Sequence, residues 1–211
     1  MDTSNLVLMR MPLGSLGTNC YVIGDKKVGE AVIIDPASTE VLEALKKYDL
    51  KPKAVLLTHG HGDHIGGVQG IVDAYDVPIY IQHDDVKYLS DPELNLSNYS
   101  NPTPIIVKGR IEEVREGDHI ICGCVDLTVY ETPGHTPGGV CYYMPGLVFV
   151  GDTLFNQSIG RTDFVEGDYD TLIDAIKTKL YTLPDETMVY PGHGPETQIG
   201  YEKQYNPFIG A

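Results

Sequence analysis

An apolar run leads directly into a loop dense in ligand-type side chains in the stretch Ala54-Val55-Leu56-Leu57-Thr58-His59-Gly60-His61-Gly62-Asp63-His64. The four apolar residues 54–57 favour a buried strand. Three histidines and one aspartate follow within six positions, and imidazoles and carboxylates bind borderline divalent metal ions. The glycines between them have no Cβ, so the backbone can turn tightly and let these side chains converge. The alternative is a polar surface loop with idle histidines, and the density of ligand-type residues argues against it.

Composition limits the function classes. The chain has 211 residues, 42% hydrophobic and 21% charged, which predicts one globular domain over residues 1–211. Its net charge of −15 has no offsetting basic block, which disfavours a nucleic-acid-binding surface. No apolar run approaches the ~20 residues of a membrane span, and the first residues lack the pattern of a secretory signal. We therefore expect a cytoplasmic protein with neither nucleic-acid nor membrane partners; the oligomeric state is not predicted.

The four cysteines are too few and too scattered for a disulfide framework in a chain of this length. Cys122 and Cys124 are two positions apart in a strand-like run, which would place them on one face. We interpret these two as small buried hydrophobic residues rather than as metal ligands.

Apolar runs bounded by glycine or proline predict strands in both halves of the chain. They lie at residues 6–9, 20–23, 31–35, 54–57, 78–81, 120–122, 125–130, 140–143, 147–150 and 187–190. Apolar residues at helical spacing predict helices over 38–48, 64–75, 86–89 and from 169 to 180. Residues 90–104 predict a long loop, either a lid or substrate wall or a plain surface excursion. Strand clusters leading both halves predict an α/β (α+β) fold of two mixed sheets packed face to face, with helices outside.

Three more ligand-type side chains follow apolar strands in the same way. His135 follows Pro133-Gly134, Asp152 follows Gly151, and His193 follows Pro191-Gly192. The recurrence of strand, glycine and ligand indicates that the four loops share one rim of the molecule.

Seven candidate ligands, five imidazoles and two carboxylates, are too many for one tetrahedral ion. Two metal ions ~3.5–4 Å apart that share one carboxylate would use all seven and leave room for water. Zinc, iron and manganese all suit such ligands. His83, expected at a helix start, and His119, expected in a turn, are not predicted to be ligands.

These residues resemble the metallo-β-lactamase superfamily. The order of the ligand-type residues is that of the family: the H-x-H-x-D-H pattern from His59 to His64 comes first, followed by His135, Asp152 and His193. Within the superfamily the chain is most similar to hydroxyacylglutathione hydrolase (glyoxalase II) and its short bacterial relatives. The stretches that carry this similarity are Thr132-Pro133-Gly134-His135-Thr136-Pro137-Gly138, Gly151-Asp152-Thr153-Leu154-Phe155 and Tyr190-Pro191-Gly192-His193-Gly194.

The resemblance implies a four-layer αββα sandwich and two divalent metal ions, zinc foremost. The first ion would be held by His59, His61, His135 and Asp152. The second would be held by Asp63, His64, Asp152 and His193, with Asp152 bridging.

The implied reaction is hydrolysis of a small-molecule thioester such as S-lactoylglutathione by a metal-bridging hydroxide. Asp63 would also act as a catalytic residue by steadying the proton of the nucleophile. Arg161, in Gly160-Arg161-Thr162-Asp163-Phe164, would bind a substrate carboxylate where the family has lysine. A structural ion pair of Arg161 with Asp163 or Glu166 is the equal alternative.

Other functions of the same fold stay open. A persulfide dioxygenase would hold one iron through His59, His135 and Asp152, and a lactonase would keep similar ligands. A β-lactamase is disfavoured because the common zinc type has cysteine where Asp152 stands. A binding module with a purely structural metal is disfavoured by the number of ligands. Full-length glyoxalase II ends in a helical glutathione-binding region; this chain reaches Ala211 soon after His193, so we expect no such domain, which leaves a smaller or different thioester open as the substrate.

Overall fold

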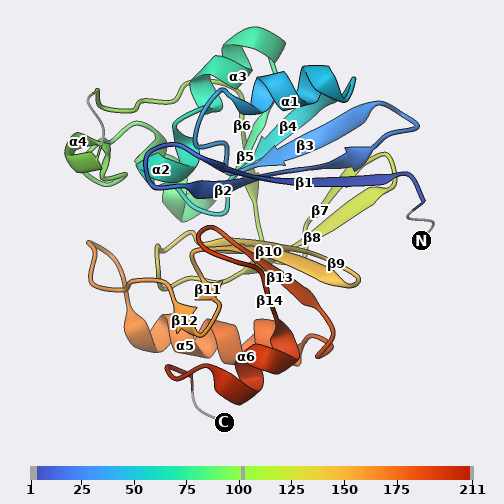
Figure 1. Cartoon of the computed structure of the whole chain (residues 1–211). Helices are drawn as coiled ribbons and strands as arrows, with labels where there is room; N and C mark the ends of the chain where they lie inside the picture. Colours follow the sequence, from blue (N-terminus) through green and yellow to red (C-terminus); the bar gives the residue numbers. More distant parts are fainter. Residues whose placement is uncertain (1–3, 101–102, 210–211) are drawn as a thin grey trace.

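Two six-stranded mixed sheets lie face to face in the middle of the molecule, with helices on their outer sides (Figure 1). The computed structural model describes residues 4–100 and 103–209. The first sheet, in spatial order, contains β1 (Leu6–Leu13), β2 (Thr18–Asp25), β3 (Glu30–Ile34), β4 (Lys51–Leu56), β5 (Ile79–Gln82) and β6 (Ile111–Val114). The second contains β14 (Thr197–Gln198), β13 (Met188–Pro191), β10 (Leu147–Gly151), β9 (Val140–Met144), β8 (Val125–Glu131) and β7 (His119–Cys122).

Helices form the two outer layers. Helices α1 (Val41–Lys47) and α3 (Val68–Tyr75) lie over the first sheet, and α5 (Tyr169–Thr178) and α6 (Ile199–Tyr205) lie under the second (Figure 1). The shorter elements are α2 (Gly62–Ile65), η1 (His83–Leu89), α4 (Ser97–Ser100), η2 (Leu180–Thr182) and the small hairpin of β11 (Leu154–Phe155) and β12 (Ser158–Ile159). The predicted four-layer αββα sandwich of two mixed sheets is confirmed.

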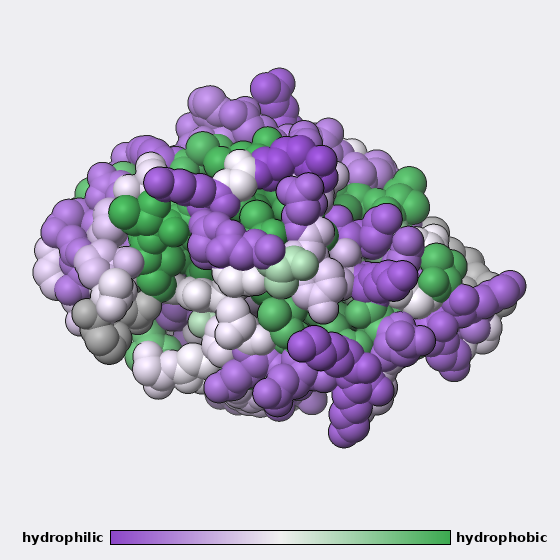
Figure 2. Space-filling view, turned by 90° about the horizontal axis from the view of Figure 1, so that it is seen from above, coloured by the Kyte–Doolittle hydropathy of each residue, from purple (hydrophilic) through white to green (hydrophobic). Residues whose placement is uncertain are grey.

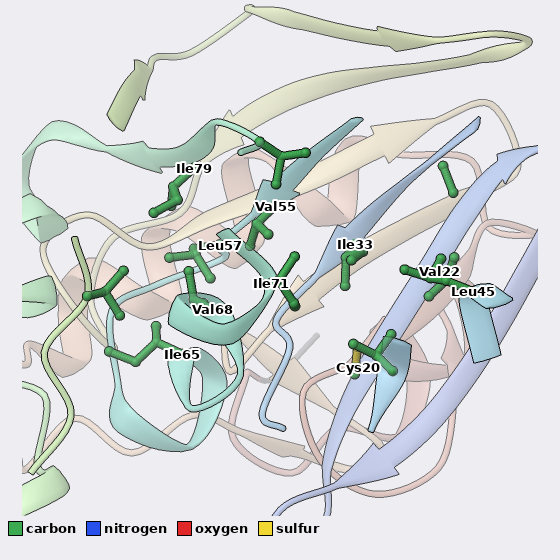
Figure 3. Packing of buried hydrophobic residues seen from close by; sticks show 14 of the residues in the cluster. Cys20, Val22, Ile33, Leu45, Val55, Leu57, Ile65, Val68, Ile71 and Ile79 are labelled. Atoms are coloured by element: carbon green, nitrogen blue, oxygen red, sulfur yellow. The ribbon is translucent and has the colours of Figure 1, made fainter. Parts of the chain in front are cut away.

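Alternating side chains of the central strands fill two different cores. In β3, Ile33 points into the core beneath α1 and α3, where it packs among Leu45, Val55 and Ile71 (Figure 3). Its neighbour Ile34 points into the core between the sheets. Burying each such side chain contributes roughly 1.5–3 kcal/mol, so the continuous apolar runs that predicted these strands reflect burial on both faces.

A third core lies between the second sheet and its helices. Val148 and Val150 of β10 pack there against Leu172 and Ile176 of α5. The outer surface is mixed: seen from above the α1 and α3 layer, hydrophilic side chains alternate with hydrophobic ones (Figure 2). Among the described residues, no helix combines the length and apolarity that crossing a membrane requires.

The structure corrects several boundaries. The helix predicted over residues 64–75 is two helices, α2 and α3, separated by Gly66 and Gly67. A Cβ on Gly66 would lie 2.4 Å from the carbonyl oxygen of Ala37, so the chain turns where backbone segments touch. Helix α1 begins at Val41, and the Ser38 hydroxyl accepts a hydrogen bond from Glu40 N in the preceding turn.

Several short elements were not predicted: β6, α6, η2, β14 and the β11–β12 hairpin, as well as α4, which lies inside the predicted loop. Strand β6 and helix α6 have no strong apolar period, since β6 is an edge strand and α6 buries the charged Glu202. The prediction that Cys122 and Cys124 share a strand face is wrong, because Gly123, with a φ of +59°, forms the turn between β7 and β8. Cys122 is buried and Cys124 half-buried, and the four thiols form no disulfide.

Candidate metal centre

All seven predicted ligand side chains converge at one edge of the two sheets. His59 and His61 follow β4, and Asp63 and His64 belong to α2, directly after them. The other three extend from loops at the ends of second-sheet strands: His135 after β8, Asp152 after β10 and His193 after β13. Strands β10 and β13 are parallel neighbours, so Asp152 and His193 leave the sheet at the same edge.

Hydrogen bonds between the sheets fix the two halves of this cluster. The Thr58 carbonyl, next to His59, accepts a hydrogen bond from Val140 N of β9 at 2.8 Å. Asn19 of β2 reaches across to the loop that carries His193: its N–H donates to the Gly192 carbonyl at 2.7 Å and its side-chain amide donates to the Pro191 carbonyl at 2.9 Å. Ligands from both sheets are therefore held in register by backbone contacts.

The ligand atoms fall into overlapping groups that could each hold a metal ion. The groups are His59, His61 and His135; His59, His64 and Asp152; and Asp63, His64 and His193, each with its ligand atoms within 4.8 Å of one another.

Asp152 lies between these groups. Its Oδ2 is 3.7 Å from Nε2 of His135 and 3.7 Å from Nε2 of His193, and its Oδ1 is 3.4 Å from Nε2 of His64. The carboxylate therefore faces ligands from both sides of the cluster, the position that a bridging ligand requires.

Several buried polar atoms of the cluster have no hydrogen-bond partner. These are Nε2 of His59, Nε2 of His64 and Oδ1 of Asp152. Buried polar groups are nearly always paired, so unpaired atoms that point at one another need an explanation. Nδ1 of His61 and Nε2 of His135 also lie only 3.0 Å apart. A divalent cation would satisfy all of these atoms, and the donor set of imidazoles and carboxylates fits zinc, iron or manganese.

Outer hydrogen bonds orient the imidazoles. Asp35, at the end of β3, lies with Oδ2 2.9 Å from Nδ1 of His64, and the same oxygen accepts the Thr58 hydroxyl at 2.6 Å. Nδ1 of His135 lies 2.7 Å from the Arg161 carbonyl oxygen. Contacts of this kind leave the opposite ring nitrogen facing the cluster, as in metal-binding histidines.

Asp85 of η1 ties two ligand loops together. Its fully buried carboxylate accepts hydrogen bonds from Gly60 N at 2.9 Å, from the Thr136 hydroxyl at 2.8 Å and from Gly138 N at 2.8 Å. Gly60 stands between His59 and His61, and Thr136 follows His135. One carboxylate therefore sets the distance between these two loops.

Two glycines stand where neighbouring atoms come too close to leave room for a Cβ. A Cβ on Gly192 would lie 2.3 Å from Oδ1 of Asp152 and 2.6 Å from Cε1 of His64. A Cβ on Gly160 would lie 1.8 Å from the Asp152 carbonyl oxygen. The glycines beside the ligands thus make room for the ligands themselves.

The electrostatics of the cluster favour a cation. Burial lowers the pKa of His59, and neighbouring imidazoles lower it further; the same causes lower the pKa of His61 to about 3. Burial opposes the charged form of His64, but the carboxylates of Asp63, Asp152 and Asp35 outweigh it and raise its pKa. The negative field that attracts a proton to His64 is the field that would attract a metal ion.

Both carboxylates that face the cluster are held in their charged form. Burial works against this, but the charge of nearby His64 outweighs it and lowers the pKa of Asp63 and of Asp152. Asp63 also accepts a hydrogen bond from the Thr18 hydroxyl at 3.0 Å.

A cavity of about 530 Å³ opens onto the cluster. Its lining residues are Leu16, His61, Asp63, Asn95, Leu96, Tyr99, His135, Asp152, Phe155, Arg161, Phe164 and His193. Leu96 and Tyr99 come from the long loop predicted at residues 90–104, which therefore supplies one wall; residues 101 and 102 lie outside the described residues.

Arg161 lies at the rim of this cavity and pairs with Asp163, one of the two predicted alternatives for this side chain. Its guanidinium donates two hydrogen bonds to the carboxylate, at 2.9 and 2.8 Å. Glu166, the other predicted partner, pairs with Lys87 instead.

His83 and His119 lie outside the cluster, as predicted. His83 is the first residue of η1 and pairs with Glu113, and His119 pairs with Asp126. His119 begins β7 rather than occupying a turn. Sequence reasoning missed Asp35 and Asp85, whose only signal was an aspartate directly after or near a strand end, which is equally typical of a turn.

Comparison with known proteins identifies the family. The model of the metallo-beta-lactamase superfamily matches residues 13–193. The chain belongs to the metallo-beta-lactamase superfamily.

Three relatives place the chain within the superfamily. It is 38% identical to the probable metallo-hydrolase YqgX of Bacillus subtilis, over 95% of this chain and 96% of that protein. It is 35% identical to the hydroxyacylglutathione hydrolase GloC of Haemophilus influenzae, over 95% of this chain and 97% of that protein. The crystal structure of the BLEG-1 B3 metallo-beta-lactamase shares 40% identity and a TM-score of 0.89, covering 96% of this chain and 99% of that one.

Superfamily membership and these relatives together support a metallo-hydrolase with a divalent metal site. The predicted resemblance to hydroxyacylglutathione hydrolase is confirmed at the level of sequence. A β-lactamase is disfavoured on sequence because Asp152 stands where the common zinc type has cysteine. BLEG-1 weakens that argument, since a protein named a metallo-beta-lactamase is 40% identical to this chain.

Proposed function

We propose that this protein is a dinuclear metal-dependent hydrolase that cleaves a small-molecule thioester. The observation that carries the proposal is the position of Asp152 between two groups of ligands, with one oxygen facing His64 and the other facing both His135 and His193. One such group would hold one ion; the groups overlap through His59 and His64, and a carboxylate that faces ligands on both sides of them suits a pair. The first ion would be held by His59, His61, His135 and Asp152, and the second by Asp63, His64, Asp152 and His193.

When bound, two divalent ions, zinc in the first place, would supply a water of lowered pKa and a Lewis acid for the substrate carbonyl oxygen. The thiolate of a thioester leaves without a strong general acid, which fits a cavity floor made of metal ligands. The relative named hydroxyacylglutathione hydrolase makes S-lactoylglutathione the first substrate to test.

Asp63 is the residue of the cluster best placed to orient a water molecule. Its side chain is 20% exposed at the cavity, and its Oδ2 lies 3.0 Å from Nε2 of His193. Since its pKa is held low, its carboxylate is a weak base and accepts a hydrogen bond rather than storing a proton. In the proposed reaction, Asp63 would accept a hydrogen bond from the attacking water and so orient it.

Metal analysis and activity assays on one preparation test the proposal. We expect two divalent ions per chain, S-lactoylglutathione hydrolysis that chelation abolishes, and recovery when the metal is restored. Circular dichroism of the metal-free protein distinguishes a catalytic from a structural metal: the fold should persist without a catalytic metal and be lost without a structural one. Metal-loaded protein with no thioesterase activity would overturn the proposal.

Three alternative activities belong in the same assay. His59, His135 and Asp152 form a set of two imidazoles and one carboxylate that suits a single non-haem iron, so a persulfide dioxygenase would show one iron per chain and oxygen uptake with a persulfide. The likeness to BLEG-1 adds a β-lactam substrate to the panel. A lactone ester completes it, because the same ligands would serve a lactonase.

A further inference from the structure

Glu202 of helix α6 is a fully buried carboxylate that lies outside the metal cluster. Its Oε2 accepts hydrogen bonds from Gln157 N at 3.0 Å and from the Asn206 side-chain amide at 2.9 Å. Its Oε1 accepts a hydrogen bond from the Thr197 hydroxyl. Burying a carboxylate costs free energy unless hydrogen bonds replace its water, and all three donors here are neutral. The partners of Glu202 therefore indicate what it holds in place.

One of these partners belongs to the tip of the β11–β12 hairpin. Asn156 and Gln157 form its two-residue loop, and Gln157 has a φ of +55°, a left-handed conformation that needs support in a residue other than glycine. Asn206, at the end of α6, donates to the Ser158 carbonyl at 3.0 Å, and the Tyr201 hydroxyl accepts from the Gln157 side-chain amide at 2.6 Å. A two-stranded ribbon of this length is not stable by itself. Residues of α6 and its C-terminal end therefore fix the tip of the hairpin.

The same hairpin carries one wall of the cavity. Phe155, the last residue of β11, lines the cavity, and the centre of its ring lies 6.3 Å from that of His193, with the rings edge to face. Phe155 pairs with Ser158 across the hairpin and is two residues from Gln157. Leu154, by contrast, is anchored in the core between the second sheet and its helices. A shift of the tip would therefore move Phe155 and leave Leu154 in place.

We propose that Glu202 is a positioning residue for substrate binding: through the tip of the β11–β12 hairpin, it holds Phe155 beside His193 as a wall of the cavity. The inference rests on the thioester hydrolysis proposed above, but the position of Phe155 can be measured without any reaction. Glu202 acts through the hairpin and takes no part in bond cleavage. Its loss should therefore weaken substrate binding and leave the chemical step unaffected.

A fluorescent probe reports the position of Phe155 directly. The chain contains no tryptophan, so the substitution Phe155→Trp introduces a single indole at the cavity wall. In this background, we expect Glu202→Ala to shift the emission to longer wavelength and to raise quenching by acrylamide, because the indole loses its packing and becomes more exposed. Unchanged emission and quenching in Glu202→Ala would overturn the proposal.

Two variants control for a general loss of stability. In Glu202→Gln, the side-chain oxygen can still accept the two N–H donors, and the amide can donate to the Thr197 hydroxyl. Tyr181→Phe removes the hydrogen bond of 2.9 Å from the Tyr181 hydroxyl to the Glu202 carbonyl and leaves the carboxylate untouched. Both should keep the emission and quenching of the Phe155→Trp parent. A shift in Tyr181→Phe as large as that in Glu202→Ala would show that any weakening of α6 moves the hairpin, and the proposal would fall.

Kinetics on the chain with its native Phe155 separate positioning from folding. With metal-loaded Glu202→Ala, we expect KM for S-lactoylglutathione to rise roughly two- to tenfold, the range for the loss of one aromatic contact, with kcat and metal content unchanged. Phe155→Ala should raise KM by itself, and Glu202→Ala should then add nothing to it. A role in stability alone would lower the amount of active protein, and so the apparent kcat, at unchanged KM; that result would contradict the proposal.

If Glu202→Ala does not fold, Asn206→Ala takes its place, because it removes the hydrogen bonds to the Ser158 carbonyl and to Glu202 with a smaller change. The same shift in emission and the same rise in KM are expected, and their absence would count against the proposal. If the wild-type protein hydrolyses no thioester, the proposed function fails and the role of Glu202 in substrate binding fails with it. The fluorescence still decides whether Glu202 places Phe155.

Discussion

The carboxylate of Asp35 lies 2.9 Å from Nδ1 of His64, with both groups fully enclosed by the protein. Asp35 also accepts the backbone N–H and the hydroxyl of Thr58, the residue before His59. A single aspartate at the end of β3 therefore orients one candidate ligand directly and supports the start of the loop that carries His59, His61 and Asp63.

Asp35→Asn tests this support. Asp35 has a φ of +49°, and asparagine tolerates this left-handed backbone, so the variant removes charge without adding strain. We expect metal affinity to fall roughly 10- to 100-fold, as for other partners of metal-binding histidines, measured by competition with a chelator. Asp126→Asn, at the exposed pair with His119, is the control and should keep full affinity. Unchanged affinity in Asp35→Asn would show that His64 needs no such partner.

Metal binding should release protons. Neighbouring carboxylates raise the pKa of His64, so the metal-free protein holds a proton there near pH 7 that a ligating imidazole cannot keep. The release should therefore diminish as the pH rises through this pKa. Calorimetric titration with Zn²⁺ in buffers of different ionisation enthalpy measures it. Asp35→Asn should release less, since one of the charges that raises the pKa is gone; equal release would contradict this cause.

Asp85→Ala should destabilise the fold and loosen the metal centre. It leaves the N–H groups of Gly60 and Gly138 and the Thr136 hydroxyl without their acceptor. The expected loss is about 2–4 kcal/mol of unfolding free energy, read from urea denaturation. Asp84→Ala, at the exposed neighbouring position, is the control. A stable Asp85→Ala variant that still binds metal with wild-type affinity would show that the two loops hold their spacing without it.

Gly192→Ala should remove metal binding and keep the fold. The added methyl would overlap Oδ1 of Asp152 and Cε1 of His64, and a misplacement of about 1 Å is enough to disable such a site. Metal content and far-ultraviolet circular dichroism check the two halves of this prediction. Gly109→Ala, whose Cβ would meet only Ile79 and Val72 side chains at 3.2 Å, is the control. Two ions bound to Gly192→Ala would refute the steric argument.

The convergence of the ligands was predictable because it follows from strand ends. His135, Asp152 and His193 each follow an apolar strand and a glycine, and strands of one sheet that run in parallel end at the same edge. What the pattern did not reveal was the support around them. A lone aspartate such as Asp35 or Asp85 has the same sequence signature as an ordinary turn residue, and its partners are 23 to 53 positions away.

The missed elements have a similar physical origin. Strand β6 carries two exposed glutamates between Ile111 and Val114, so its alternation is hidden. Helix α6 buries Glu202, whose carboxylate accepts hydrogen bonds from Gln157 N, Asn206 and Thr197. Periodicity of apolar residues detects only elements that bury apolar side chains.

The division of the ligands between the two sheets has a consequence for biosynthesis. His59, His61, Asp63 and His64 leave the ribosome long before His193, whose strand, β13, must still insert beside β10. The full set of candidate ligands therefore comes together only when β13 has joined the second sheet. Assembly of the cluster is a late event in the formation of this fold.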